Sequence, residues 1–237
     1  MTRFLLLLTI FIFDSLSALT FKDKLLTGMK GDYIITEQNK FCSLIRIHSI
    51  SIEKLVIEEI SFPQSSLPKD LNKWLEGGAK GNTSWSFIEI NPNTSALTSH
   101  FSFTKNAWLV PNPDDSFFLK ILDMPFSPIL ESQRRKIGPP PKEGADTRKI
   151  WNPSLIFQGK KIQSPEFSAY RIEMPKDGSI LSGKRIELFF NKNDETFPFP
   201  LWGQITDDSN AALKFRVIDS GKNLSSPKKN PYDRISP

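Results

Sequence analysis

The side chains that could support nucleophilic catalysis are few and badly spaced. The chain has one cysteine, Cys42, and two histidines, His48 and His100. A nucleophilic thiol needs a base within hydrogen-bonding reach. Cys42 and His48 lie in one predicted strand, an even number of residues apart, so their side chains face the same side of the sheet. Six strand residues, however, correspond to roughly 20 Å. These two side chains therefore cannot pair within that strand, and the sequence has no G-x-S-x-G motif.

Acidic side chains offer no metal site and no obvious acid–base pair. Glu58 and Glu59 are adjacent in a predicted strand, so they face opposite sides of the sheet. Asp114-Asp115 and Asp207-Asp208 lie beside turn-forming residues. The histidines lack the spacing of a zinc motif. We expect no catalytic residue, metal or cofactor, although two carboxylates from different strands could still serve a hydrolase.

Composition indicates one globular β-rich domain. The 237 residues include 19 Phe, 5 Trp and 18 Pro, with 38% hydrophobic residues, 24% charged residues and a formal charge of +5. These values are close to those of ordinary globular proteins. A single cysteine excludes an internal disulfide and a thiolate zinc site.

Residues 1–18 have the features of a secretory signal peptide. Arg3 precedes the ten apolar residues 4–13, and Asp14 ends the run before small residues. A membrane-spanning helix needs about 20 apolar residues, so the shorter run favours a cleaved signal. No cysteine follows it that could carry a lipid. We predict export to a bacterial periplasm or cell envelope without a lipid anchor.

Two-residue alternation of apolar and polar side chains dominates the chain after residue 30 and predicts strands. Nothing in the sequence indicates an oligomeric state. A helix is predicted over 68–76, with Pro68 in its first turn and Gly77 beyond its end, and a second short helix around 128–135. The predicted strands span 31–38, 41–50, 52–62, 83–91, 96–104, 116–123, 166–174, 183–191, 197–206 and 211–219. The β-rich domain is predicted over residues 19–221.

Basic residues cluster in a proline-rich loop predicted over residues 134–149. The five that form this basic patch are Arg134, Arg135, Lys136, Arg148 and Lys149. A basic patch can attract an anionic envelope surface. Export argues against a nucleic-acid partner, and so does the lack of interleaved aromatic residues. The basic tail, residues 222–237, is predicted to be disordered and dispensable for folding.

Aromatic side chains form apolar rows along three predicted strands. The rows comprise Trp85, Phe87, Phe101, Phe103, Phe197, Phe199 and Leu201. In the third row, Phe197, Phe199 and Leu201 alternate with prolines, which cannot donate a hydrogen bond to a neighbouring strand. The segment is therefore predicted to be an edge strand, or to join the sheet only after its prolines. Such rows either pack a core or line the concave side of an unclosed barrel.

The C-terminal strands resemble a known group of proteins. The segments GKRIELFF at 183–190, FPFPLWGQI at 197–205 and LKFRVIDSG at 213–221 are similar to the end of the lipoprotein-carrier (LolA-like) superfamily. The chain as a whole resembles uncharacterised exported proteins of chlamydial type. The resemblance implies a highly curved antiparallel sheet that holds an apolar ligand under short helices, with no catalytic residues.

We therefore expect a mainly β protein with a single curved antiparallel sheet, a half-barrel of about 9–11 strands, and one or two short helices. The leading functional hypothesis is non-catalytic binding of a hydrophobic ligand or lipidated partner, with the seven apolar residues on the concave side. A structural or protein-interaction module of the envelope with a dry core is the alternative. A hydrolase of unknown type is third.

Overall fold

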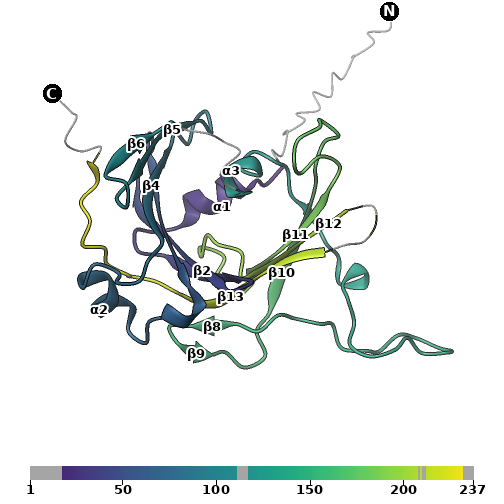
Figure 1. The fold of residues 1–237 in the computed structure, drawn as a ribbon. Coiled ribbons are helices and arrows are strands. Elements are labelled where there is room, and N and C mark those ends of the chain that lie inside the picture. Colours follow the sequence, from purple (N-terminus) through teal and green to yellow (C-terminus); the bar gives the residue numbers. More distant parts are fainter. Residues whose placement is uncertain (1–17, 111–116, 208, 210–211, 232–237) are drawn as a thin grey trace, which may run out of the picture.

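An open antiparallel sheet of eleven strands, drawn in Figure 1, forms the body of the protein. The computed structural model describes residues 18–110, 117–207, 209 and 212–231. The strand order is β6-β5-β4-β3-β2-β1-β13-β12-β11-β10-β7, and every pairing is antiparallel. The strands are β1 Tyr33–Gln38, β2 Phe41–Ile50, β3 Leu55–Pro63, β4 Ser84–Ile90, β5 Leu97–Ser102, β6 Ala107–Leu109, β7 Ser127–Pro128, β10 Phe167–Glu173, β11 Arg185–Asn191, β12 Trp202–Thr206 and β13 Ala212–Gly221. The expected fold class is confirmed.

A separate two-stranded sheet, β8 Ile156–Phe157 and β9 Lys160–Lys161, lies beside β13. The described residues also form three short helices: α1 Phe21–Thr27, α2 Leu71–Glu76 and α3 Phe117–Lys120. No helix in the described part of the chain is long and apolar enough to cross a membrane. The predicted signal peptide falls almost wholly on residues 1–17, which lie outside the described residues.

Local sequence explains where these elements begin and turn. Asn39 takes a left-handed φ of 57° in the tight turn between β1 and β2, a conformation that asparagine tolerates better than most residues. Thr20 and Asp23 form a capping box at the start of α1. Asp70 caps α2 by accepting a hydrogen bond from the backbone N–H of Lys73 at 3.1 Å.

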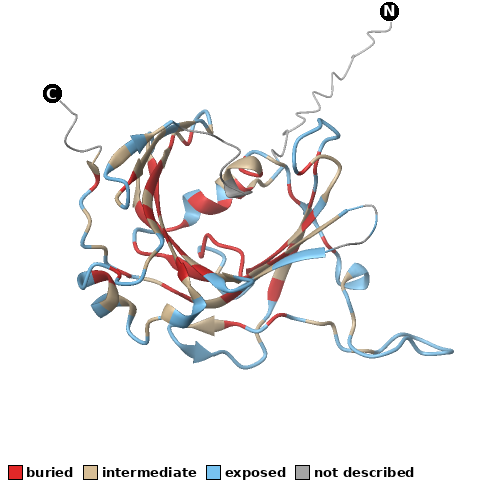
Figure 2. Ribbon diagram, in the orientation of Figure 1, coloured by how far each residue is buried: buried red, intermediate tan, exposed pale blue. Residues whose placement is uncertain are grey.

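Both faces of the sheet carry buried side chains, and buried residues recur along its strands in Figure 2. On the concave face, Ile34, Ile45 and Leu188 belong to a large core that also includes residues of α1. On the convex face of β1–β4, Leu44, Phe62 and Trp85 form a second core with Leu75 of α2. Successive side chains of β1–β4 therefore point alternately into two apolar cores, one on each face of the sheet. Neither face of these strands is exposed to solvent over its whole length.

Three sequence predictions about secondary structure need correction. The segment 116–123 was expected to be a strand, but Phe117–Lys120 forms the helix α3. The second helix expected around 128–135 is a single 3₁₀ turn over Glu131–Gln133. The row of alternating proline and apolar residues does not begin a strand at 197, because proline has no N–H for the ladder. β12 begins only at Trp202.

The prediction of a disordered tail is wrong for residues 222–231. This segment, which we call the strap, runs from the end of β13 across the convex face towards α2 and β4 (Figure 1). Leu224 is 4% exposed and Asn230 is 5% exposed. The strap has few apolar residues, and polar contacts with the sheet hold it instead.

Candidate functional site

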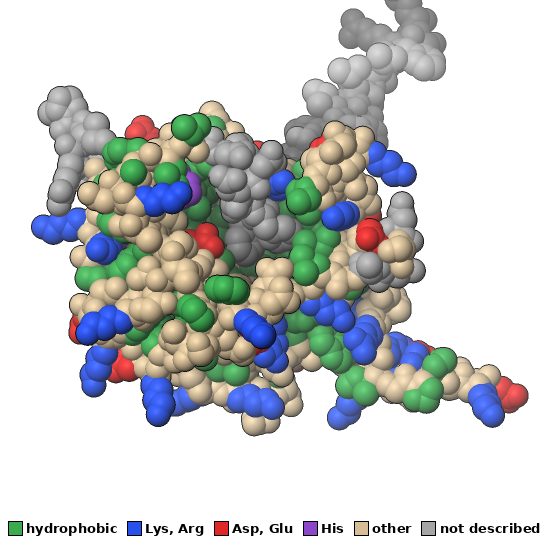
Figure 3. Space-filling model, viewed as in Figure 1, with side chains coloured by type: hydrophobic (Ala, Val, Ile, Leu, Met, Phe, Trp, Pro, Cys, Tyr) green, Lys and Arg blue, Asp and Glu red, His purple; other side chains and the backbone are tan. Residues whose placement is uncertain are grey.

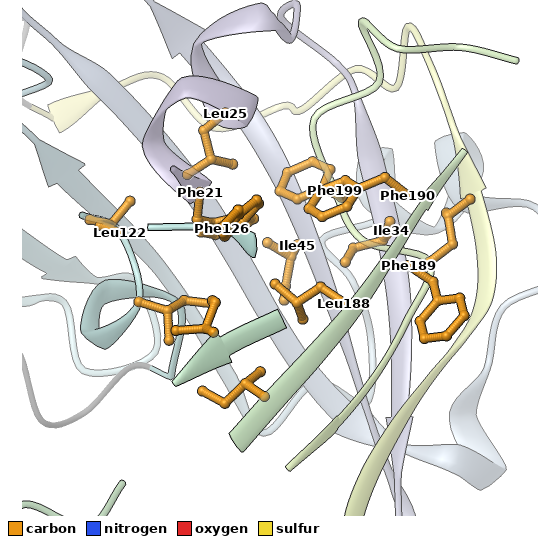
Figure 4. Close-up of a cluster of buried hydrophobic side chains, with 14 of the residues drawn as sticks. Phe21, Leu25, Ile34, Ile45, Leu122, Phe126, Leu188, Phe189, Phe190 and Phe199 are labelled. Atoms are coloured by element: carbon orange, nitrogen blue, oxygen red, sulfur yellow. The ribbon is translucent and has the colours of Figure 1, made fainter. Parts of the chain in front are cut away.

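The concave side of the sheet is filled at one mouth by a plug that we define as residues 19–27 and 119–129. α1 and α3 lie within the hollow of the half-barrel in Figure 1. The two segments of the plug bind each other through Lys22 N–H to Leu122 O at 2.9 Å and Phe126 N–H to Leu19 O at 2.7 Å. Figure 4 shows Phe21 and Leu25 of the plug close to Ile45 and Phe199.

Side-chain contacts fasten the plug to both rims of the open sheet. On the β4–β5 side, Lys22 Nζ donates to Ser95 Oγ at 3.0 Å, and Ser95 Oγ donates to Asp123 Oδ1 at 2.5 Å. On the β11–β12 side, Lys24 Nζ donates to Glu195 O at 3.4 Å and Thr27 Oγ1 to Thr196 O at 3.2 Å. The plug thus spans the opening of the half-barrel without joining its sheet as a strand over most of its length.

An apolar pocket of about 30 Å³ lies between the plug and the concave face. This volume is enough for about one water molecule. The lining comes from the plug, from β2–β4 and from the segment before β12, and consists of Phe21, Leu25, Ile45, Ile57, Glu59, Ile88, Ile90, Leu119, Leu122 and Phe199. Glu59 is the only ionisable side chain in that lining.

Burial raises the pKa of Glu59 above the ordinary glutamate value of 4.5, and a hydrogen bond from Ser43 partly offsets the effect. The apolar side chains around the pocket disfavour the charged carboxylate. Since the folded chain holds this proton more tightly than the unfolded chain, stability falls as the pH rises above 4.5 towards the raised pKa. The sequence signals this site only through the alternation of side chains in the strand, which places Glu59 on the other face of the sheet from Glu58.

We expect Glu59→Gln to raise the free energy of unfolding at pH 7, because glutamine removes the cost of an ionised carboxylate in the pocket. The gain should shrink as the pH falls and vanish well below pH 4.5, where wild-type Glu59 is protonated in both states. Urea unfolding at a series of pH values measures this difference. A stability difference that does not change with pH would contradict the assignment of a raised pKa.

The structure divides the seven predicted lining residues between the two faces. Phe197, Phe199 and Leu201 belong to the large core that includes the concave face. The other four do not lie on the concave side as expected: Trp85, Phe87, Phe101 and Phe103 form ring contacts with one another on the convex face. Ile88 and Ile90 of β4 face the pocket instead. Alternation correctly grouped the aromatic residues, but it does not say which face is concave.

A sealed cluster of charged side chains lies on the convex face beneath the strap. Arg46 is 1% exposed and Glu58 is 0% exposed, and Arg46 Nε donates to Glu58 Oε2 at 2.8 Å. Arg46 also contacts His48 Nδ1 at 2.8 Å, and Trp85 Nε1 donates to Glu58 Oε1 at 2.8 Å. Burial alone would raise the pKa of Glu58, but hydrogen bonds from its neighbours and the charge of Arg46 lower it overall.

The cluster fastens the strap to the sheet. Arg46 donates to Leu224 O at 2.6 Å, and Ser226 Oγ donates to Glu58 Oε1 at 2.7 Å. Lys228 Nζ lies 4.8 Å from the ring centre of Trp85. Because the Ser226 hydroxyl binds the carboxylate and not an imidazole, the cluster does not have the arrangement of a serine nucleophile and its base. Its geometry fits a structural role.

We expect deletion of residues 222–237 to lower the melting temperature, which corrects the prediction that this tail is dispensable. Exposing a buried leucine costs about 1.5–3 kcal/mol, and each kcal/mol lowers the melting temperature of a chain this long by about 2–4 °C. Thermal unfolding followed by circular dichroism should show a fall of at least about 3 °C. Deletion of 232–237 is the control, because it keeps every described strap contact. Equal melting temperatures for the two deletions would contradict the docked strap.

The predicted basic patch is an ordered arm rather than a free cluster of charges. A bridge between Lys136 and Ile150 pairs its two sides. Arg134 donates to Phe167 O at 3.0 Å, and Asp146 pairs with Lys136 at 3.1 Å and with Arg148 at 2.9 Å. Arg135 stacks on Trp151 at 5.5 Å, and Lys149 is exposed. The arm extends from the body with Lys and Arg side chains along it (Figure 3).

The convex side also carries a groove of about 530 Å³. Its lining includes Tyr33 and Ile218 of the sheet, Leu67 and Asp70 before α2, and Gln158 of the β8–β9 turn. This volume lies within the range of small-ligand sites. Among the residues that the structure describes, no group of His, Cys, Asp or Glu could hold a metal ion.

Comparisons with known proteins identify the family. Residues 43–163, just over half of the chain, match the family model described as CT021 protein. The structure is similar to a solved structure of the hypothetical protein CT021 from Chlamydia trachomatis, with a TM-score of 0.62 and 24% identity over 90% of this chain and 96% of that chain. No curated protein matches. The expected similarity to chlamydial proteins is confirmed, whereas the resemblance to lipoprotein carriers stays an expectation. The chain belongs to the CT021 protein family.

Proposed function

We propose that the protein is a non-catalytic binding protein that holds an apolar ligand, such as a lipid chain or a lipidated partner, on the concave face of its sheet. The observation that carries the proposal is the open half-barrel with an apolar concave face and a separate plug across its mouth. A sheet that needed only a dry core could close into a barrel or be covered by a long helix.

Binding requires the plug to move, because the pocket of about 30 Å³ is far too small for a lipid chain. The C-terminal end of the plug is held by the pairing of β7 with β10. Elsewhere the contacts at the rims are few, and join Lys22, Lys24, Thr27 and Asp123 to Ser95, Glu195 and Thr196. An acyl chain that enters the hollow replaces the apolar contacts of Phe21 and Leu25 with equivalent ones. The exchange therefore costs little apolar burial.

Export to the bacterial envelope without a lipid anchor is part of the proposal. The basic n-region and the ten apolar residues 4–13 support it. In that compartment the ligands at hand are lipids and the acyl chains of lipoproteins. The exposed cations of the arm, such as Lys149, would favour approach to an anionic envelope surface.

Native mass spectrometry of the mature chain, exported into a bacterial periplasm, tests the proposal. We expect a co-purifying adduct of lipid mass. Ile88→Trp places a bulky ring where Ile88 lines the pocket, and it should remove the adduct. Phe101→Trp is the matched control, because Phe101 lies on the convex face of the neighbouring strand, and it should keep the adduct.

A wild-type protein that shows only the bare mass, and that gains no adduct when incubated with lipid, would contradict the proposal. An adduct that survives Ile88→Trp would place the ligand elsewhere. The convex groove of about 530 Å³ then becomes the leading site.

That groove supports a second candidate function, an interaction module of the envelope with a dry core. Its walls come from the strap, the segment before α2 and the β8–β9 turn, so three separate loops could contact one partner. Crosslinking of the exported protein in its own cell envelope, followed by identification of bound proteins, tests this second candidate. A groove-lining Leu67→Arg variant should lose the crosslinked partner.

A further inference from the structure

The concave face changes from apolar to polar along the strands of its N-terminal half. Residues directly opposite each other in an antiparallel pair lie on the same face of the sheet. Ile45 lines the pocket, so every second residue of β2 faces the hollow with it. The strand register then defines two concave rows with polar residues beside the pocket. The first is Thr36, Ser43, Ser61 and Ser84, and the second is polar at Glu59, Ser86 and Ser102 and continues with the apolar Ile45 and Ile34 on β2 and β1.

The next row along the strands is apolar on β2–β4 and ends on β5 with His100, which lies opposite Ile88. It contains Ile47, Ile57 and Ile88, of which the last two line the pocket with Glu59. Glu59 therefore lies at the boundary between an apolar region and a region of hydroxyl groups. Such a boundary on one continuous concave surface matches a molecule with an apolar tail and a polar head.

The hydroxyl groups are near enough to act together. Ser43 Oγ and Ser61 Oγ are 3.2 Å apart, and Thr36 Oγ1 donates to Ser43 O at 3.4 Å. Ser43, Ser61, Ser84 and Ser86 are all partly exposed in the folded chain. A hydroxyl both donates and accepts hydrogen bonds, so the rows can bind a polar head in several orientations.

The carboxylate of Glu59 would favour a cationic head group of an amphiphile over a neutral or anionic one. In the part of the chain that the structure describes, no Lys or Arg forms an ion pair with Glu59. A carboxylate that is partly removed from water gains most from a cation that also donates hydrogen bonds to it. An anionic head would be repelled at the same place.

We propose that the two polar rows and Glu59 form the head-group site for an amphiphile whose head carries an amine. This inference rests on the proposed function, because the tail of the amphiphile would occupy the space of the plug. The ammonium group would bind Glu59, and further polar groups of the head would bind the serine hydroxyls.

Binding of three simple amphiphiles of equal chain length tests the inference. Decylamine, decanol and decanoic acid, each below its critical micelle concentration, are titrated into the full mature protein by calorimetry at pH 7. Decylamine should bind about tenfold to a hundredfold more tightly than decanol, as expected for charge-assisted hydrogen bonds. Non-specific attraction would have the opposite sign, because the full chain has a formal charge of +5.

Glu59→Gln should reduce decylamine affinity to about that of decanol, because glutamine offers the ammonium group no negative charge. Glu89→Gln is the charge-matched control. Glu89 lies opposite Val56 on the convex face and pairs with Lys54 at 3.1 Å, so this variant should bind decylamine as the wild type does. Ser61→Ala should weaken decylamine binding less than Glu59→Gln does.

The outcomes separate this inference from the proposed function. Equal affinity for the three amphiphiles, or decylamine affinity that survives Glu59→Gln, would overturn the amine head-group site while decanol binding still supports an apolar ligand site. Failure of all three amphiphiles to bind would overturn both.

Discussion

Replacing Arg46 with alanine is expected to lower the free energy of unfolding by about 3–5 kcal/mol, as for other buried ion pairs that lose one partner. The variant leaves Glu58, which is 0% exposed, without its cation. It also leaves Leu224 O without the donor that now lies 2.6 Å away. Urea unfolding followed by tryptophan fluorescence measures the loss, and an unchanged m-value would show that two-state unfolding is retained.

Two further variants show whether the loss comes from the buried charge. Arg46→Met combined with Glu58→Leu removes both charges, and it should cost much less than Arg46→Ala alone. Arg216→Ala breaks an ion pair with Glu37 in which the arginine is 65% exposed, so it should change stability by at most about 1 kcal/mol. A small effect of Arg46→Ala would mean that water reaches Glu58 beneath the strap.

The sheet could be predicted from the sequence because its signal is local. Alternation identified most of the long strands, and the Asn39-Lys40 turn set the register of β1 with β2. The parity argument also separated Glu58 from Glu59 correctly, since one is buried in the convex ion cluster and the other lines the concave pocket. These conclusions need only the two-residue period of a strand.

The faces of the sheet could not be assigned in the same way. Both faces of β2–β4 carry apolar side chains, so the alternation predicts an apolar row on each face. It does not show which of the two rows faces the hollow. Aromatic content drew attention to Phe87 and Phe101, but the smaller Ile88 and Ile90 face the pocket. Which row is concave depends on the curvature of the whole sheet, and no window of sequence contains that information.

The plug and the strap escaped prediction for a different reason. α1 has seven residues, too few for a clear helical period, although the Thr20–Asp23 capping box and the spacing of Phe21 and Leu25 were signals that could have found it. The strap reads as a polar tail because polar contacts with Arg46 and Glu58 hold it in place. Such contacts depend on tertiary structure.

Replacing Phe199 with alanine is expected to lower the free energy of unfolding by about 3–5 kcal/mol, as for other buried phenylalanines. Phe199 is 1% exposed and lines the pocket beside Phe21 and Leu25 of the plug. Phe41→Ala is the matched control, because Phe41 is 55% exposed and its loss should change stability by about 0.5 kcal/mol or less. Urea unfolding of the two variants measures both values.

The same variant connects stability to the proposed binding site. Removing the Phe199 ring enlarges an apolar pocket of about 30 Å³, and enlarged apolar cavities in protein cores bind small apolar molecules. Benzene should therefore raise the melting temperature of Phe199→Ala but not that of the wild type or of Phe41→Ala. If Phe199→Ala costs no more than Phe41→Ala, the plug does not pack against the sheet in solution. The hollow would then already be open to a ligand, and binding would need no displacement of the plug.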